Sequence, residues 1–436
     1  MPNKLEETNH KPQQLARFYY GWWLVSSAIV VYGLLGGLNY SALPVYFLPL
    51  AREFDITYTR VSVIFSLRSL LDVVGAPLGG FLVDKLGPRF MIAGGVILGG
   101  VGFILLAFTK SYLQFVVVLM GLVSLGFSAP DHGVSAGINM WFRRRLGIAI
   151  SMASTGLAIG GFALTPFIAW LVLGFSWRWA AGISGILMLT MGLPLAVVYR
   201  KPRPTETEDE DFGGNNPTGK ECPMNETFNG GRPSPIVPNL DFTIREAIHT
   251  PTYWLLGAAL ALRLLAQNTL MVHIVPILVS QDISEGFAAA FISLVAFARL
   301  PTSIIAGFIS DKWSRQRISA IANFVGAVAC VAILLGPGGL PTGVVFGLFF
   351  GFAHAANAIT WALVGQFYGR NNFGLLRGSV TVIPGLAAAA GPVLAGWSFD
   401  HTGTYTTVLV SVGLIYFLAA IIFWNLQPPR PLAHTL

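Results

Sequence analysis

The sequence has few charged residues and almost no cysteine. Of its 436 residues, 11% are charged and 54% are hydrophobic. So little charge among long apolar runs excludes an ordinary soluble domain and indicates an integral membrane protein. The two cysteines, Cys222 and Cys330, form no CxxC pair, which excludes a disulfide framework and leaves a structural metal unsupported.

Signatures of catalysis and of secretion are also missing. The chain has no nucleotide-binding loop, no nucleophile elbow and no cluster of metal ligands, so we expect neither an enzyme nor a bound cofactor. No small-residue cleavage site follows the first apolar segment. We therefore expect that segment to remain as a transmembrane helix.

What the sequence has instead is a series of apolar runs, each long enough to cross a bilayer. Windows of about nineteen residues predict twelve spans and hence an all-α membrane protein. The spans are 20–48, 58–82, 90–109, 113–140, 146–172, 178–199, 252–279, 286–309, 317–336, 341–368, 376–397 and 405–427.

The basic residues predict the orientation of these spans. With a cytoplasmic N-terminus, twenty of the 27 Lys and Arg residues fall in cytoplasmic segments, and only Arg52, Arg60, Lys110 and Arg178 fall outside. This bias places both termini in the cytoplasm. The net charge of +7 therefore reflects membrane orientation, and we expect no nucleic-acid partner.

Residues 200–250 interrupt the apolar pattern. They are rich in Pro, Gly, Asn and acidic residues and read as a flexible cytoplasmic linker. Thr243 and Glu246 have the spacing of a capping box, which predicts a short surface helix before the seventh span. We thus predict a six-helix bundle over 1–199, the linker over 200–250 and a second six-helix bundle over 251–436.

The two halves repeat each other. GGFLVDKLGPRF, after the second span, matches AGFISDKWSRQR, after the eighth. In this alignment Asp84 and Lys85 correspond to Asp311 and Lys312. GFSAPDH of the fourth span matches GFAHAAN of the tenth at a similar offset. Two six-helix repeats joined by a long loop predict a transporter whose bundles rock about a midplane site.

The loop after the second span resembles the signature loop of the major facilitator superfamily. Its G-x-x-x-D-K-x-G-x-R pattern falls at Gly80, Asp84, Lys85, Gly87 and Arg89. The resemblance implies a cytoplasmic gating and helix-packing loop that does not touch the substrate. In that family the acidic residue pairs with a neighbouring helix in the outward-open state.

Other stretches resemble the monocarboxylate-porter and oxalate–formate antiporter group. They are YYGWWLV, WFRRRLGIAISMASTGLAIGG, WRWAAG and FGLLRGSV with the later GWSFDHTGTY. In that group an arginine like Arg299 binds the substrate carboxylate, which implies the same role here. The aspartate that animal members carry one turn earlier is Val295 in this chain, and residues 376–397 lack the lysine of the oxalate carrier.

Arg299 is also unusual on physical grounds. It is the one charge in the apolar stretch 287–309, near the middle of the span. A guanidinium there costs about 2.5–3.5 kcal/mol on insertion scales, so it should face a cavity or the bundle interior. It either forms a structural ion pair or holds a substrate anion, and the rest of the chain favours the anion.

Further ionisable residues lie in the first bundle. Arg68 and Asp72 are one helical turn apart and can neutralise each other, although Asp72 is also a candidate for coupling. Asp131 and His132 follow Pro130 deep in the fourth span. Asp131 can load and release a proton as its surroundings change, or form a fixed bond between helices.

The remaining candidates are spread over three spans. Arg263, Asn268 and His273 lie on the seventh span, where Arg263 is a second anion contact or the partner of an aspartate. His354 in the tenth span is a core histidine or a ligand. Asn39 and Tyr40 of the first span are candidates for hydrogen bonds to the substrate.

These observations predict a secondary transporter for a small organic anion. We expect a monocarboxylate, because an arginine fork suits a carboxylate, and we expect proton coupling. An anion exchanger with a counter-anion, an exporter of amphipathic drugs or metabolites, and a non-transporting sensor are the alternatives. We expect a multi-pass protein of the plasma membrane, or of the inner membrane in a Gram-negative source.

Overall fold

The computed structural model describes residues 20–142, 146–200, 242–310, 313–355, 357–368 and 373–429. These residues form helices, with no strand among them. Three predicted features lie outside the described residues. They are the Arg143 to Arg145 cluster, the acidic part of the linker, and the Asp311 and Lys312 pair of the second signature loop.

The first half of the chain supplies six helical runs that follow one another in sequence. Their elements are α1 (Tyr20–Leu34), η1 (Leu35–Ser41), η2 (Leu43–Tyr46), α2 (Phe47–Glu53), α3 (Tyr58–Leu86), α4 (Pro88–Ala107), α5 (Tyr112–Val118), η3 (Leu119–Ser124), α6 (Leu125–Trp141), α7 (Leu146–Gly174), α8 (Trp177–Leu187), η4 (Met188–Gly192) and α9 (Leu193–Ala196).

The second half supplies six more runs after a short entry helix. Its elements are α11 (Ile244–Ile248), α12 (Pro251–Val279), α13 (Glu285–Ser310), α14 (Arg315–Leu335), α15 (Gly339–Ala355), α16 (Asn357–Tyr368), α17 (Phe373–Thr402) and α18 (Thr406–Asn425). The predicted capping box is present, because the Thr243 and Glu246 side chains each accept a hydrogen bond from the other's backbone N–H.

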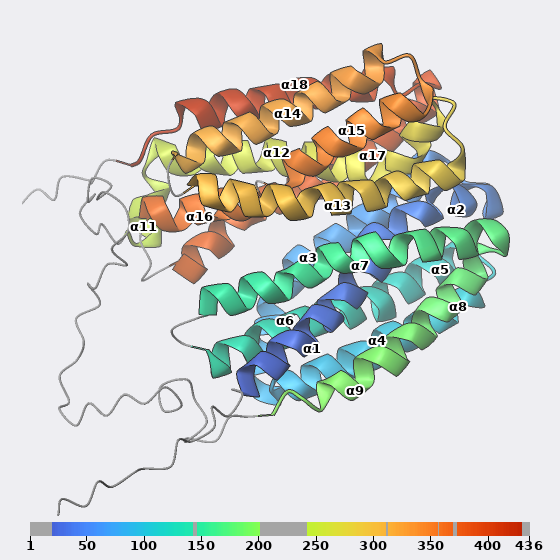
Figure 1. The fold of residues 1–436 in the computed structure, drawn as a ribbon, viewed down its shortest axis with the longest axis horizontal. Coiled ribbons are helices and arrows are strands. Elements are labelled where there is room, and N and C mark those ends of the chain that lie inside the picture. Colours follow the sequence, from blue (N-terminus) through green and yellow to red (C-terminus); the bar gives the residue numbers. More distant parts are fainter. Residues whose placement is uncertain are drawn as a thin grey trace, which may run out of the picture.

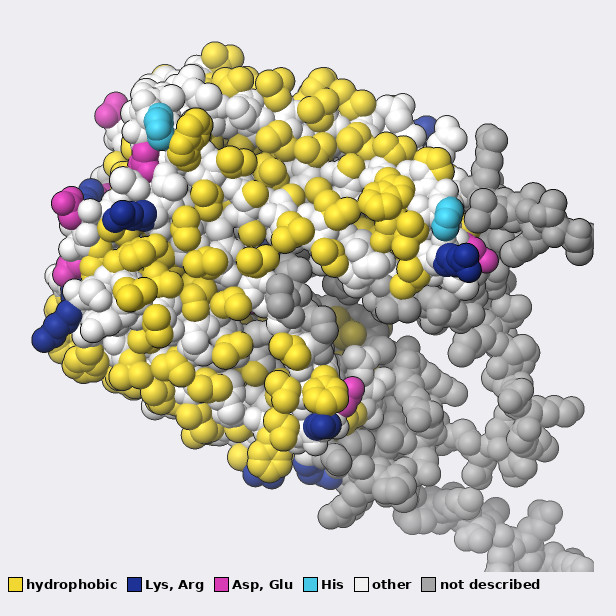
Figure 2. Space-filling view, turned by 180° about the vertical axis from the view of Figure 1, so that it is seen from behind, with side chains coloured by type: hydrophobic (Ala, Val, Ile, Leu, Met, Phe, Trp, Pro, Cys, Tyr) yellow, Lys and Arg dark blue, Asp and Glu magenta, His cyan; other side chains and the backbone are white. Residues whose placement is uncertain are grey.

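Ten of these twelve runs are long and apolar enough to cross a bilayer, counted over the described residues. The other two are α3, which carries several charges, and the pair α15 and α16, which residue 356 separates. Together they give the twelve predicted spans. Figure 2 shows the matching surface, on which apolar side chains cover the middle and charged ones gather toward the ends.

Small residues bring the helices of the first half into close contact. A Cβ added to Gly160 of α7 would lie 1.8 Å from the Gly33 carbonyl oxygen of α1, and one on Gly156 would lie 2.2 Å from the Ile29 carbonyl oxygen. Helices in lipid associate through such packing, since the tails offer no hydrophobic drive. The glycines therefore fix the α1 and α7 pair.

The two halves meet along two helix pairs. Figure 1 shows α1 to α9, in blue to green, on one side of the molecule and α12 to α18, in yellow to red, on the other. Between them α3 packs on α17, and α7 packs on α13. The repeat maps the second span onto the eighth and the fifth onto the eleventh, so the two pairs are related by the internal symmetry.

Polar contacts join the halves at one end of this interface. We call this group, Arg52, Thr59, Ser62, His273, Glu285 and Asp400, the end seam. Arg52 pairs with Glu285, and the Asp400 carboxylate accepts hydrogen bonds from the backbone N–H groups of Tyr58 and Thr59, at 2.9 and 2.8 Å. The molecule is therefore closed at the α2 end, and Figure 2 shows a notch between the halves at the opposite end.

The first span departs from the continuous helix that its apolar run suggests. It widens into a π-helical turn at Leu35–Ser41 and then tightens into a 3-10 turn at Leu43–Tyr46 that contains Pro44. Gly36 lies so close to α7 that an added Cβ would be 2.2 Å from the Leu157 carbonyl oxygen. The irregular turn is thus built against α7, and Asn39 and Tyr40 lie within it.

Candidate substrate site

A cavity of about 500 Å³ lies between the two halves, bordered by helices of both. The first half contributes Leu35, Gly36, Asn39, Tyr40, Ser41, Arg68, Asp72, Phe127, Ser128, Asp131, His132, Leu157 and Ala158. The second half contributes Gln267, Asn268, Met271, Ile292, Val295, Ala296, Arg299 and His354. Most of the residues predicted from the sequence as site candidates thus meet in one place.

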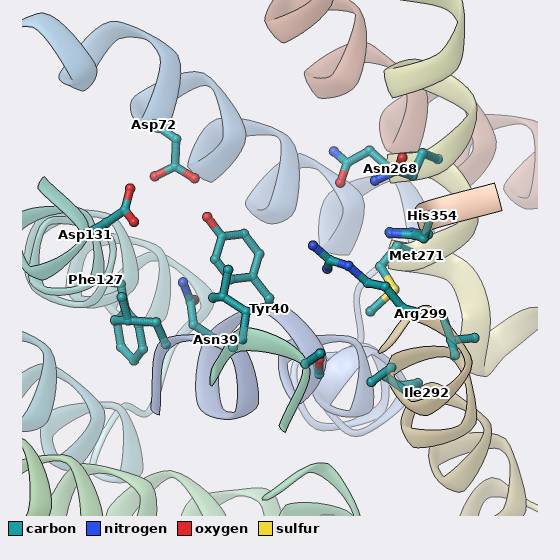
Figure 3. A pocket seen from close by; sticks show the side chains of 18 of the residues that line it. Asn39, Tyr40, Asp72, Phe127, Asp131, Asn268, Met271, Ile292, Arg299 and His354 are labelled. Carbon is teal, nitrogen blue, oxygen red and sulfur yellow. The ribbon is translucent and has the colours of Figure 1, made fainter. Parts of the chain in front are cut away.

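Arg299 forms the cationic wall of this cavity. It projects from the middle of α13, and Figure 3 shows its guanidinium pointing across the cavity toward Tyr40. Among the described residues no ion pair involves Arg299. A guanidinium that faces a cavity and has no ion pair can bind a carboxylate through two parallel hydrogen bonds.

The opposite wall is acidic. Asp72 of α3 and Asp131 of α6 both line the cavity, and Figure 3 shows their carboxylates pointing toward each other, beyond Tyr40 from Arg299. Arg68 lies 3.6 Å from Asp72, as the one-turn spacing predicts. His132 also borders the cavity and packs on α3, since a Cβ on Gly79 would lie 2.2 Å from its ring.

Tyr40 and Asn39 occupy the centre, between the cationic and the acidic walls. Tyr40 is 54% exposed, and the carbon of the Arg68 guanidinium lies 5.1 Å from the centroid of its ring, which is a cation–π contact. Asn39 is buried, and its Oδ1 has no hydrogen-bond partner in the described chain. Such a buried acceptor at a cavity wall is a natural contact for a ligand hydroxyl.

Two neighbouring residues on α12, Gln267 and Asn268, line the cavity and also form hydrogen bonds with other side chains or backbone groups. The Asn268 Nδ2 donates to the Ala388 carbonyl oxygen at 2.6 Å and to the Ser69 Oγ at 3.3 Å, so Asn268 joins α12 to α17 and to α3. Gln267 lines the cavity, and its Oε1 accepts a hydrogen bond from the Arg263 Nη2 at 3.2 Å. The Gln267 amide NH₂ is therefore the group that can donate to a ligand.

Arg263 and His273 lie off the cavity lining. Arg263 is buried within the second half, where its Nη1 donates to the Thr360 Oγ1 at 3.3 Å. His273 is fully buried in the end seam, with the Pro392 carbonyl oxygen 2.9 Å and the Ser62 Oγ 3.0 Å from Nε2. Because the carbonyl only accepts, Nε2 carries a proton, which leaves Nδ1 to accept from the Tyr405 hydroxyl at 2.9 Å.

His354 remains at the cavity. It lies on α15 beside Arg299, and its ring meets that of Phe350 edge to face at 4.9 Å. The His354 Nε2 is buried and has no partner among the described residues. His354 therefore has a free polar atom near the cationic wall, whereas those of His273 are all used.

The first signature loop lies away from this cavity. Gly80 lies within α3, and Asp84, Lys85 and Arg89 are exposed where α3 ends and α4 begins. Gly87 joins the two helices with a φ of +84°, a conformation that only glycine adopts without strain. The glycine of the motif thus forms a tight turn between α3 and α4.

Sequence reasoning missed the apolar part of the lining, which includes Leu35, Phe127, Met271 and Ile292. In a chain with so many apolar residues, no single Leu or Phe stands out. The Gly36-Gly37 pair ahead of Asn39 was the one available signal, because it lets the first span approach α7 and turn its next residues inward.

Comparison with known families agrees with this architecture. The sequence profile of the Major Facilitator Superfamily matches residues 25–356 and 256–435. The chain belongs to this superfamily. It is a multi-pass membrane transporter and not an enzyme, as the sequence predicted.

Among curated proteins, the chain is similar to several monocarboxylate transporters. It is 24% identical over 435 residues to "Monocarboxylate transporter 12-B" of Danio rerio, covering 92% of this chain and 87% of that protein. It is 25% identical over 410 residues to "Monocarboxylate transporter 2" of Homo sapiens, covering 92% and 84%. The predicted resemblance to the monocarboxylate group is confirmed.

Among solved structures, the fold matches that of a bacterial homologue of the human lysosomal transporter Spinster. Its inward-facing, occupied form gives a TM-score of 0.71 at 14% sequence identity, covering 93% of this chain and 96% of that one. The unoccupied form gives 0.67 at 16% identity, covering 94% and 98%. At these identities the match concerns the fold alone.

Proposed function

We propose that this chain is a secondary active transporter that carries a small monocarboxylate by alternating access, together with a proton. The observation that carries the proposal is Arg299, which faces the cavity between the halves and has no ion pair in the described chain. In this proposal the substrate carboxylate is the partner that forms an ion pair with Arg299. The similarity to monocarboxylate transporters favours the same class of substrate.

The two halves, residues 1–199 and 251–436, act as rocking bundles in this proposal. The end seam closes one side, and from the bias of Lys and Arg we infer that this side faces outside the cell, with both termini in the cytoplasm. The described state is then inward-facing, and substrate leaves toward the cytoplasm. We place the protein in the plasma membrane, or in the inner membrane of a Gram-negative cell.

The test is uptake into proteoliposomes, with and without an inward proton gradient, of labelled lactate, pyruvate, acetate and oxalate. Removing one partner of a buried charge pair costs about 2–5 kcal/mol. We therefore expect Arg299→Ala to lower uptake of the preferred monocarboxylate by about 30-fold or more. Arg299→Lys should recover part of this loss, because it keeps the charge but not the fork.

The matched control is Arg60→Ala, which removes an exposed arginine of α3 whose backbone carbonyl still accepts from Tyr112. It should transport like the wild type. Equal uptake by Arg299→Ala and the wild type would refute the role of Arg299 in binding the substrate carboxylate. Uptake that depends on an internal counter-anion and ignores the proton gradient would favour an exchanger instead.

A further inference from the structure

A carrier that only binds an anion has no need for the two carboxylates, Asp72 and Asp131, that form the acidic wall of the cavity. Two carboxylates line the same space that an anionic substrate must enter, one on α3 and one on α6. They lie across Tyr40 from Arg299, and each is close enough for its charge to act on the other. Like charges held close together in a low dielectric are seldom both ionised.

Charge balance gives these residues a role. The charged residues of the lining are Arg68, Arg299, Asp72 and Asp131, so the empty cavity is neutral when both carboxyls are ionised. A bound carboxylate adds one negative charge. One proton on the acidic wall restores neutrality, and the loaded carrier can then close around its cargo without an unbalanced charge.

We propose that Asp72 and Asp131 together hold the coupling proton, shared between their facing carboxyls, while the substrate is anchored in the other half by Arg299. This inference rests on the proposed function. Asp72 is held by Arg68 at 3.6 Å, and Asp131 lies beside the Tyr32 hydroxyl, which is 3.0 Å from the Ser135 Oγ. Proton and substrate thus bind on opposite walls of one cavity.

Besides the pair itself, the titratable and charged groups that line the cavity or lie beside the pair come from six elements. They are Arg68 on α3, His132 on α6, Tyr32 on α1, Tyr40 on η1, Arg299 on α13 and His354 on α15. Arg68 favours ionised Asp72, whereas the opposing carboxylate favours a proton between the two. Tyr40 lies between the walls, so substrate arriving at Arg299 changes the field that the pair experiences.

The transport test compares Asp72→Asn, Asp131→Asn and the double variant with the wild type. Asparagine imitates the protonated carboxyl, so each variant should still exchange labelled for unlabelled substrate. None should accumulate substrate in response to a proton gradient, which supports about tenfold accumulation per pH unit in the wild type. Because one proton is shared, each single variant should lose as much accumulation as the double.

Infrared difference spectroscopy of the purified protein gives a second readout that needs no substrate. Titration of the wild type in D₂O should reveal one protonated-carboxyl band, and either single variant should lose or shift it. Asp282→Asn is the control, since it alters an acid at φ +61°, where asparagine is tolerated. It should keep both the band and the accumulation.

Three results would overturn the shared site. One is normal proton-driven accumulation in Asp72→Asn with an unchanged band, which would assign the proton to Asp131 alone. Another is loss of exchange in both single variants, which would make the acidic wall a contact for a cationic group of the substrate. The third is accumulation driven by sodium in place of protons. Failure of the wild type to move any carboxylate would refute the proposed function, and the infrared titration would still decide this inference.

Discussion

The cavity and the end seam both contain ionisable side chains between the two halves, but their surroundings differ. In the seam, His273 has partners on both ring nitrogens, and Asp400 accepts from the start of α3. In the cavity, Arg299 has no ion pair in the described chain, and the Asn39 Oδ1 and His354 Nε2 have no partner there. Satisfied groups hold a closed end together, whereas polar groups without a partner on residues that line a cavity are candidates for contacts with a ligand.

Substitution of one histidine in the seam and one at the cavity should have different effects on stability. His273→Ala removes a buried ring and leaves the Tyr405 hydroxyl and the Pro392 carbonyl without it, so we expect a loss of about 2–4 kcal/mol of stability. His354→Ala removes a ring that borders an existing cavity, and it should cost less than about 1 kcal/mol. Thermal unfolding in detergent compares the two. Equal losses would contradict the distinction between seam and cavity.

Asp400 tests the seam without touching the core. Its carboxylate, on α17, accepts hydrogen bonds from the backbone N–H groups of Tyr58 and Thr59 at the start of α3, in the other half. In Asp400→Ala those groups can bind water, so stability should change little. The closed state loses charge-assisted hydrogen bonds, and we expect the closed-to-open ratio at this end to fall about 5- to 30-fold.

The measurement is labelling of a cysteine at Ala158, which lines the cavity, by an impermeant reagent added from the Asp400 side. The background replaces Cys222 and Cys330 by serine. Faster labelling in Asp400→Ala supports the seam as a latch. Labelling at the wild-type rate would show that α3 and α17 stay together without this carboxylate.

The sequence predicts the spans and much of the polar lining of the cavity because the underlying signals are local. Arg299 stands alone in an apolar stretch, Arg68 and Asp72 are one turn apart, and Gly87 marks a tight turn. Each of these features depends on neighbours within about ten residues. The twelve spans follow from apolar length in the same way.

The sequence could not separate Arg263 and His273 from the residues that line the cavity. Both lie on α12, whose exposed side also carries large apolar residues such as Trp254 and Leu255, so hydrophobicity alone does not show how the helix is rotated. Instead, Gln267, Asn268 and Met271 are the residues of α12 that line the cavity. The partners of Asp400 are 341 and 342 residues away, and no local pattern reveals contacts of that kind.

Two ion pairs near the end seam should give the smallest effects, and they distinguish contacts between the halves from contacts within one half. Arg52 with Glu285 joins the two halves, whereas Arg178 with Glu53, at 2.7 Å, lies within the first half. Both pairs are partly exposed, and such pairs contribute about 0–1 kcal/mol. Neither Glu285→Gln nor Glu53→Gln should therefore alter thermal stability appreciably.

Only the pair that crosses the interface should affect access to the cavity. Glu285→Gln weakens a contact that exists in the closed end alone, so labelling at Ala158 should become about 2- to 5-fold faster. Glu53→Gln leaves Arg178 bonded to the Thr109 carbonyl at 2.9 Å and stacked on Trp177, and labelling should not change. If both variants accelerated labelling equally, surface charge and not the junction of the halves would control opening, because the two substitutions remove the same charge at the same end.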